Sequence, residues 1–418
     1  MRKTITFIFP VFFEILFVCI SFCSCVWNDN SDSPLYLPLD DSEFPYAGLP
    51  RLVIETEDFA QISDRETNLC AKLQIYGENS PESDVLDLEI KGRGNSSFTM
   101  AKYSIKLKFE NKQSLFGMPK DKEWDLVANH RDKSMLRNYI TYQLAHTLHD
   151  GYSPRNQFVE VFLNRKYMGV YMLVEHIKVS PQRVKIYEDD SSFLFEKTSA
   201  TATGENLITT DMGYIYDICY PKNPSAQIKE NLKSHLNSFE NFLQSKIVNN
   251  TDSLRKWINL DDFIRYYWIQ EFSHNADGAF RRSHFITWQK GLPMQMGPVW
   301  DFDIAYGISS NGIVSPNSWY VKRYGWYRLV FKNKQVKKMA VNYWKENKNH
   351  FEDMLDSIDQ AWPRLNKAMQ NEFKRWPVLE NDSDWPFIEA YDSYEEAVNA
   401  LKDWIKQRLK WVDENYDL

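Results

Sequence analysis

The chain has 418 residues, of which 43% are hydrophobic, 15% aromatic and 26% charged. This composition is typical of a globular protein and excludes an intrinsically disordered chain. The formal net charge of −7 argues against a general nucleic-acid-binding protein, because such proteins present basic surfaces to the phosphate backbone.

The first residues have the layout of an export signal. Arg2 and Lys3 precede the apolar run "ITFIFPVFFEILFVCISFCSC", and the polar stretch "NDNSDSP" follows soon after it. A retained transmembrane helix is the alternative. Pro10 and Glu14 lie inside the run, however, and an acid near the bilayer centre costs about 2 to 3 kcal/mol. Cleavage of the run is therefore favoured.

The end of this run resembles a bacterial lipoprotein signal, with Cys25 as the lipidated residue. We therefore expect a signal peptide over residues 1–24 and a polar tether over 25–46. The protein would be exported and lipid-anchored to the bacterial cell envelope, on its periplasmic or outer side.

Strand patterns dominate the next part of the chain. From about Leu49 to Phe109, segments such as "RLVIETE" and "YSIKLKFE" alternate apolar and polar residues, with "ENSPES" and "GNSS" as turns. We predict an antiparallel sheet here. A helix over about 134–148 follows, after which "FVEVFLNRKYMGVYMLVEHI" returns to the strand pattern.

Helix patterns dominate from about Ser225 onward. In the long segment from Val336 to Trp376, apolar residues recur every three or four positions, and a last helix begins at the capping box Ser393–Glu396. The sequence thus predicts an α+β fold over residues 47–418. A strand-rich part over about 47–178 precedes a mainly helical part over about 179–418.

Two acids stand one residue apart in "GPVWDFDIAYG". If this segment is a short strand, its period of two places Asp301 and Asp303 on one face. Two like charges at about 4 Å repel by about 4 kcal/mol at an effective dielectric of about 20, so a buried pair needs a cation or a proton. A hard ion such as Mg²⁺ suits oxygen ligands. Alternatively, one acid caps a turn and the other pairs with an Arg or Lys.

A third acid, Asp277, lies in the turn after a predicted helix, 24 positions before Asp301. An acid on a loop and another on the following strand suit a phosphotransferase, in which one orients the acceptor hydroxyl and the other holds the metal. An ordinary turn residue is the alternative interpretation of Asp277.

The strand-rich part offers two candidate phosphate contacts. The turn "KGRGNSS" contains Arg93, Gly94, Asn95 and Ser96, and its backbone N–H groups could approach phosphate oxygens. Lys106, on the next predicted strand, could extend to a phosphate. A simple hairpin and solvated edge lysines are the alternatives.

In order along the chain, "IKGRGNSS", "LFGMPKDKEWDLVANHRDKSMLRNYI", "PRNQFVEVFLNRKYMGVYMLVEHIK", "HNADG" and "GPVWDFDIAYG" resemble the CotH kinase family of atypical secreted protein kinases. The likeness runs from about Leu49 to Asp413. It implies a kinase-like fold of two lobes, an N-lobe over about 47–178 and a C-lobe over about 179–418. It also implies binding of ATP with Mg²⁺ or Mn²⁺, and phosphate transfer to an exported protein.

The resemblance also implies roles for single residues. Asp277 resembles the catalytic acid, and Asp301 the acid that holds the metal, with Asp303 as a helper or a structural cap. The turn around Arg93 would cover the nucleotide and Lys106 would contact its phosphates. The segment around Glu175 would join the lobes, where adenine would stack.

The sequence departs from ordinary kinases at two places. The predicted helix over 134–148 contains no Glu to pair with Lys106. Arg282 occupies the position, five after Asp277, of a second metal ligand. Ser283 or Asp303 could replace that ligand, or a single ion could bind.

A non-catalytic surface module for a glycan or a protein partner is the alternative function. The aromatic stretch "NSWYVKRYGWYRLV" helps to choose between this module and the kinase. If its aromatic side chains form an exposed flat row they favour a binding surface, and if they are buried they belong to the core.

Overall fold

The computed structural model describes residues 35, 43–148, 151–309, 312–379 and 390–416. The chain divides into residues 1–31 and a compact unit of residues 32–418, and the fold is that of the second unit. The predicted signal peptide, the lipidation site Cys25 and most of the predicted tether lie outside the described residues. Within the described ranges, no helix is both long enough and apolar enough to cross a membrane.

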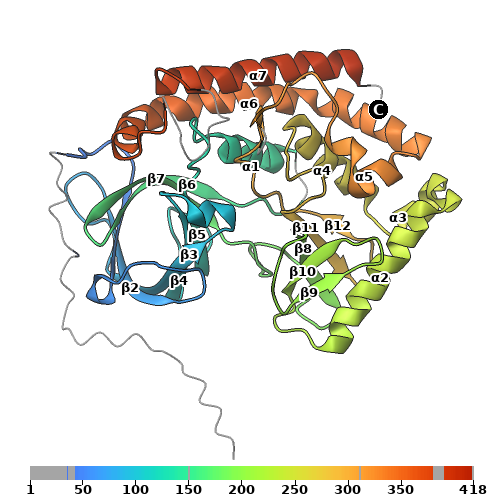
Figure 1. Ribbon diagram of the computed structural model, residues 1–418, viewed down its shortest axis with the longest axis horizontal. Coiled ribbons are helices and arrows are strands. Elements are labelled where there is room, and N and C mark those ends of the chain that lie inside the picture. Colours follow the sequence, from blue (N-terminus) through green and yellow to red (C-terminus); the bar gives the residue numbers. More distant parts are fainter. Residues whose placement is uncertain (1–34, 36–42, 149–150, 310–311, 380–389, 417–418) are drawn as a thin grey trace, which may run out of the picture. The chain divides into compact units, whose positions relative to one another are not determined.

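A closed barrel of seven strands forms the first part of this unit (Figure 1), in the order β1-β2-β3-β4-β5-β7-β6. Neighbouring strands pair antiparallel, as predicted, except that β6 closes the barrel by parallel pairing with β1. The strands are β1 (Arg51–Thr56), β2 (Leu69–Tyr76), β3 (Leu86–Arg93), β4 (Ser104–Gln113), β5 (Asp121–Val127), β6 (Asn156–Leu163) and β7 (Lys166–Glu175).

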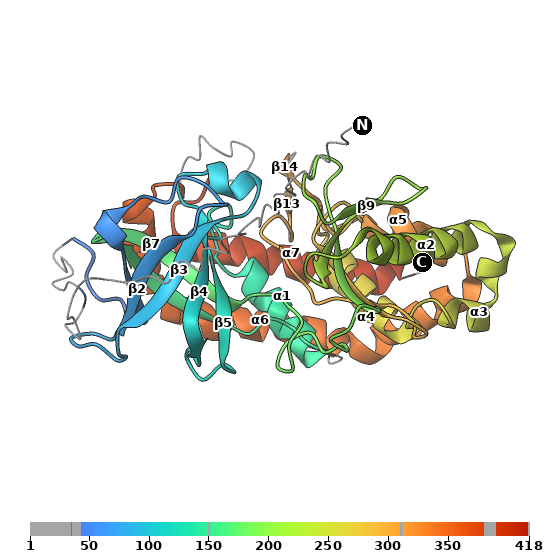
Figure 2. The same ribbon diagram turned by 90° about the horizontal axis from the view of Figure 1, so that it is seen from below.

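Alternation along the strands separates the two faces of the barrel wall. Apolar residues at every second position, such as Ile90, Leu107 and Trp124, fill the interior. Residues on the opposite face of β3, β4 and β5, including Arg93 and Lys106, therefore point out of the barrel. The three strands lie side by side in Figure 2.

A second sheet lies in the part that was predicted to be mainly helical. Its order is β12-β11-β8-β10-β9, and all its pairings are antiparallel. Strand β8 is buried at nearly every position, so its sequence lacks the alternation that marks a half-exposed strand. The strands are β8 (Ser192–Lys197), β9 (Leu207–Thr209), β10 (Ile215–Tyr220), β11 (His284–Gln289) and β12 (Gln295–Met296), and a small hairpin follows with β13 (Ile308–Ser309) and β14 (Gly312–Ile313).

The helices largely follow the predicted ranges. Helix α6 packs on α1, α4, α7 and the barrel strand β7. At the start of α7 the side chain of Ser393 accepts a hydrogen bond from the backbone N–H of Glu396, as the capping box predicted. The helices are α1 (Arg137–Thr147), α2 (Ala226–Gln244), α3 (Thr251–Arg255), α4 (Leu260–Phe272), α5 (Gly325–Val330), α6 (Lys334–Arg375) and α7 (Tyr394–Asn415).

The aromatic stretch over residues 317–330 is core. Trp326 and Tyr327 are fully buried, and Trp319 and Tyr320 pack against the main hydrophobic cluster. Within this stretch, Tyr324 is the aromatic side chain that reaches 38% exposure. The stretch therefore forms no exposed flat row.

The predicted α+β class is thus confirmed. The arrangement is a seven-stranded barrel followed by a sheet with helices, and it is not clearly a kinase fold of two lobes.

Candidate active site

A cavity of about 870 Å³ is lined by residues from the barrel and from the second sheet with its loops. The barrel contributes the ends of β3, β4 and β5, and the other side contributes β8 and the loops after α4 and β12. Seven of the predicted site residues line this cavity: Arg93, Gly94, Asn95, Ser96, Asp277, Asp301 and Asp303. Lys106 and Glu175 are not among the lining residues.

The turn after β3 is fixed by a glycine and by an arginine. Gly94 has φ +94°, a backbone conformation that is strained for a residue with a side chain, and a Cβ atom there would also lie 2.1 Å from Oγ of Ser97. Nη1 of Arg65 donates to the carbonyl of Gly94 at 2.8 Å and to Oδ1 of Asn95 at 2.7 Å. These contacts support the turn, and Asn95 and Ser96 line the cavity.

Asp277 lies in the loop that follows α4, and its side chain is nearly buried. Oδ1 of Asn275 accepts a hydrogen bond from the backbone N–H of Asp277 at 3.1 Å, and Nδ2 of Asn275 donates to Gln270 at 3.0 Å. Nε of Arg282 forms an ion pair with Oδ1 of Asp277 at 2.9 Å. Burial and the neighbouring carboxylate of Asp301 nevertheless raise the pKa of Asp277 to about 6.

The segment that carries Asp301 and Asp303 is not a strand, so that prediction is wrong. Residues 297–303 have no strand partner, and Asp301 has φ +67°, a left-handed conformation that is strained for a non-glycine residue. The backbone N–H of Phe302 donates to Oδ1 of Asn138 at 2.7 Å, and Nδ2 of Asn275 donates to the carbonyl of Asp301 at 3.3 Å. Contacts from α1 and from the Asp277 loop thus hold the bend in place.

The two carboxylates still lie together, by way of this bend rather than by strand alternation. Burial and the carboxylate of Asp301 raise the pKa of Asp303 well above its ordinary value. Oδ2 of Asp301 accepts a hydrogen bond from Oγ of Ser283 at 3.1 Å. The pair is partly buried, at a place where carboxylates lie close together.

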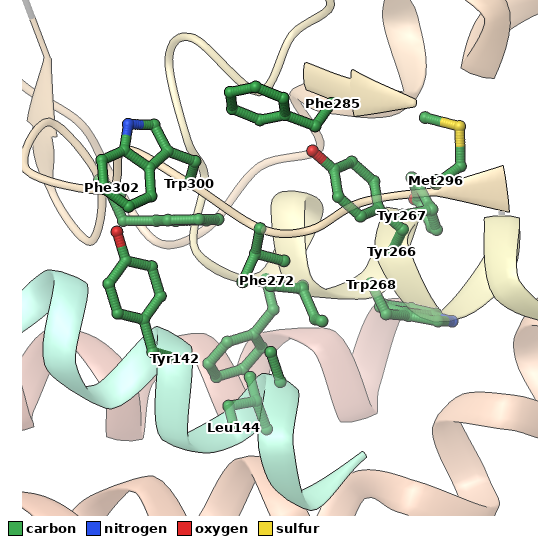
Figure 3. Close-up of a cluster of buried hydrophobic side chains, with 14 of the residues drawn as sticks. Tyr142, Leu144, Tyr266, Tyr267, Trp268, Phe272, Phe285, Met296, Trp300 and Phe302 are labelled. Carbon is green, nitrogen blue, oxygen red and sulfur yellow. The ribbon is translucent and has the colours of Figure 1, made fainter. Parts of the chain in front are cut away.

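Aromatic side chains anchor the same segment from below (Figure 3). Trp300 and Phe302, which flank Asp301, are both buried. Tyr142 from α1 points toward Trp300 and stacks on it, with 6.0 Å between ring centroids and 21° between planes. This burial explains why bulky apolar residues surround the acids: they fix the backbone from which the carboxylates project.

The charged residues of the cavity that the sequence reasoning missed include Glu196 and Arg131. Oε1 of Glu196 on β8 accepts from the backbone N–H of Ser283 at 3.2 Å. Burial and the carboxylates of Asp217 and Asp301 raise the pKa of Glu196 to about 7. Burial lowers the pKa of Arg131, and the carboxylate of Asp303 opposes that shift. Glu196 lies outside the segments that carry the family resemblance, whereas Arg131 lies inside one of them but was given no role.

The donor set fits a divalent ion that is shared with phosphate. Within the described ranges, no group of three or more His, Cys, Asp and Glu side chains is arranged to hold a metal by itself. Asp301 and Asp303 supply carboxylate oxygens and Ser283 a hydroxyl oxygen. Mg²⁺ typically uses one or two carboxylates and completes its shell with water and substrate phosphates. These residues meet that requirement.

Lys106 and Glu175 have partners of their own away from the cavity. Nζ of Lys106 forms an ion pair with Glu123 at 2.9 Å and lies 3.1 Å from Nε2 of His176. Glu175 is fully buried and forms an ion pair with Arg155 at 2.9 Å. The side chains of Lys106 and Glu175, both predicted to lie at the nucleotide, are therefore engaged with other residues of the protein.

A buried Lys–Glu pair does occur at the cavity, but with other residues. Nζ of Lys102 lies 2.7 Å from Oε1 of Glu372 in α6, and both side chains are almost completely buried. The two residues stand 270 positions apart in the sequence. Sequence spacing could not have indicated that partner.

A family model described as CotH kinase protein matches residues 90–412, which is most of the chain. A comparison of this chain with curated proteins found no match.

Proposed function

The chain belongs to the CotH kinase family, and on this premise we propose that it is an atypical protein kinase. It would transfer the γ-phosphate of ATP to a hydroxyl group of an exported protein. One observation carries the proposal: the carboxylates of Asp277, Asp301 and Asp303 line one cavity, and two of them have raised pKa values. Such clusters are typical of sites that bind a cation or move a proton.

In this proposal Asp277 is the group that accepts the proton of the acceptor hydroxyl. With a pKa of about 6, it is mostly ionised at neutral pH and still basic enough to take a proton. As the hydroxyl oxygen bonds to the γ-phosphorus, the bond from that phosphorus to the bridging oxygen breaks and ADP leaves. The ion pair with Arg282 orients the carboxylate, and this role suits a cation at the position where ordinary kinases have a metal ligand.

Asp301 and Asp303 would hold Mg²⁺ or Mn²⁺, which neutralises phosphate charge when it is bound. Ser283 positions Asp301 through its hydrogen bond of 3.1 Å. The turn over 94–96 would cover the phosphates with backbone N–H groups. Glu196, which binds the Ser283 backbone, fixes this side of the cavity to the second sheet.

The finer parts of the proposal concern lobes and location. The barrel would serve as the N-lobe over about 47–178, and the second sheet with its helices as the C-lobe over about 179–418. Cleavage after residue 24 and lipidation of Cys25 would place the enzyme on the cell envelope, where it meets exported substrates. The alternative of a non-catalytic surface module loses one argument, because the aromatic stretch over 317–330 is core.

The deciding experiment measures transfer and binding separately. The processed protein is incubated with labelled ATP and Mg²⁺ or Mn²⁺, and transfer to itself and to co-exported proteins is scored. Asp277→Asn should cut transfer by about a hundredfold or more and leave the ATP-induced thermal shift nearly intact, because the acid acts on the acceptor and hardly on the nucleotide.

Asp261→Asn is the matched control, since Asp261 is 71% exposed on α4. If the wild type binds ATP yet transfers phosphate to no exported protein, and Asp277→Asn behaves identically, the kinase proposal fails.

A further inference from the structure

The register of the barrel strands decides which cation reaches the cavity. Arg93 on β3 pairs with Ser104 on β4, whereas Lys106 pairs with Lys91, one pleat further along the same outer face. Arg93 and Ser104 line the cavity, and Lys106 does not. Lys106 is therefore set back from the site by two residues of strand.

Arg93 is held at the cavity by contacts on two sides. Its Nε lies 3.0 Å from Oδ1 of Asp125, which is fully buried on β5. Its guanidinium carbon lies 4.7 Å from the ring centroid of Trp300, in the segment that carries Asp301. This cation–π contact joins the barrel to the acidic side of the cavity.

The terminal nitrogens of Arg93 are available for a ligand. In the part of the chain that the structure describes, the hydrogen bonds include none from Nη1 or Nη2 of Arg93, and the side chain is 24% exposed. Other cations at the cavity are engaged: Lys102 pairs with Glu372, and Arg282 pairs with Asp277. A guanidinium that offers two N–H edges in a fixed orientation is well suited to phosphate oxygens.

A chain of polar contacts stands behind Asp125 and holds its carboxylate in place. Oδ2 of Asp125 lies 2.9 Å from Nδ1 of His176, and the other ring nitrogen of His176 lies 3.1 Å from Nζ of Lys106. Burial alone would raise the pKa of Asp125, but Arg93 and His176 lower it to about 2. The carboxylate of Asp125 is thus ionised at neutral pH, and Lys106 helps to stabilise it by way of His176.

We propose that Arg93 is the cation that binds the phosphate chain of the nucleotide, and that Asp125 is a positioning residue that holds Arg93 toward the cavity. Lys106, which the family resemblance suggested for this task, would instead act on Arg93 at a distance, through His176 and Asp125. This inference rests on the proposed function and adds to it the residues that recognise a triphosphate.

The test compares a ligand that is only phosphate with one that has none. Binding of tripolyphosphate, ATP and adenosine, each with Mg²⁺, is measured by calorimetry on the processed protein. Arg93→Gln should weaken tripolyphosphate and ATP binding by about tenfold or more and leave adenosine binding unchanged, since a charge-assisted contact to phosphate is lost. Asp125→Asn should weaken tripolyphosphate binding by about three- to tenfold, again without an effect on adenosine.

Lys106→Gln is the comparison that separates the role proposed for Arg93 from that of Lys106. It should change tripolyphosphate affinity by about twofold or less, because the contacts of Arg93 with Asp125 and Trp300 remain. A merely structural role for Asp125 would weaken adenosine and tripolyphosphate alike. If Arg93→Gln does not fold, Arg93→Lys takes its place, and its tripolyphosphate affinity must still fall more than its adenosine affinity.

The outcomes distinguish the inference from the function on which it rests. If the wild type transfers phosphate but Arg93→Gln binds tripolyphosphate as the wild type does, or Lys106→Gln loses more affinity, the inference is wrong and the kinase proposal stands. If the wild type binds neither ATP nor tripolyphosphate, both are wrong.

Discussion

Replacing Asp277 by asparagine should make the metal-free protein more stable at neutral pH. The pKa of this carboxyl is 3.8 in its ordinary state and about 6 in the folded protein. Because the pKa of Asp277 is raised in the folded protein, protonated Asp277 contributes favourably to the free energy of unfolding. This contribution is fully present below pH 3.8 and is lost as the pH rises through 6. The difference of about two pH units corresponds to about 3 kcal/mol at most. Asparagine carries no charge and avoids this loss.

The assay is thermal unfolding of wild type and Asp277→Asn with a chelator present, at pH 4 and at pH 8. We expect the variant to melt roughly 2 to 4 °C higher at pH 8, with a much smaller difference at pH 4. Asp261→Asn should match the wild type within about 0.5 kcal/mol at both pH values, because its carboxyl is exposed and its ion pair with Arg255 spans 3.5 Å. A variant less stable than wild type at pH 8, or an equal difference at both pH values, would refute the reasoning.

Two further predictions concern the metal and the anchor. Mg²⁺ or Mn²⁺ with ATP should raise the melting temperature of the wild type, since a ligand at one hundred times its dissociation constant adds about 2.7 kcal/mol to the free energy of unfolding. Asp301→Asn should abolish this shift and Asp303→Asn should weaken it less, whereas equal shifts in all three proteins would contradict the metal assignment. Cys25→Ala should release the protein from the membrane fraction or stall its processing, and unchanged attachment would favour a retained apolar helix.

Local patterns predicted the elements whose faces differ in burial. The barrel strands alternate because one face fills the interior, and α6 shows a helical stripe because one side packs on the core. The sheet strand β8 is buried on both faces, and its apolar run carries no period. The parallel pairing of β6 with β1 joins residues more than a hundred positions apart, which no local pattern can indicate.

The sequence singled out Asp277, Asp301, Asp303 and Arg93, which all line the cavity, but it did not decide between Arg93 and Lys106 as the phosphate contact. Asp277, Asp301 and Asp303 stood out because acids among glycines and large apolar residues are unusual in a short segment. The choice between Arg93 and Lys106 depends on the register of β3 against β4 and on where those strands end. Both residues occupy outward positions of neighbouring strands, so the sequence alone gives them equal standing.

Asp125 and the aspartates of the acidic cluster differ in the direction of their pKa shifts, and the contrast bears on the question whether the cluster is structural or functional. Asp125 is flanked by Arg93 and His176, and its pKa is lowered to about 2 despite its burial. Asp277 is buried and Asp303 partly buried next to the carboxylate of Asp301. The pKa values of both are raised even though Arg282 and Arg131 lie near them. The raised pKa values of Asp277 and Asp303 remain after the nearby arginines are counted, and on the proposed function the cation that would lower them comes from a ligand.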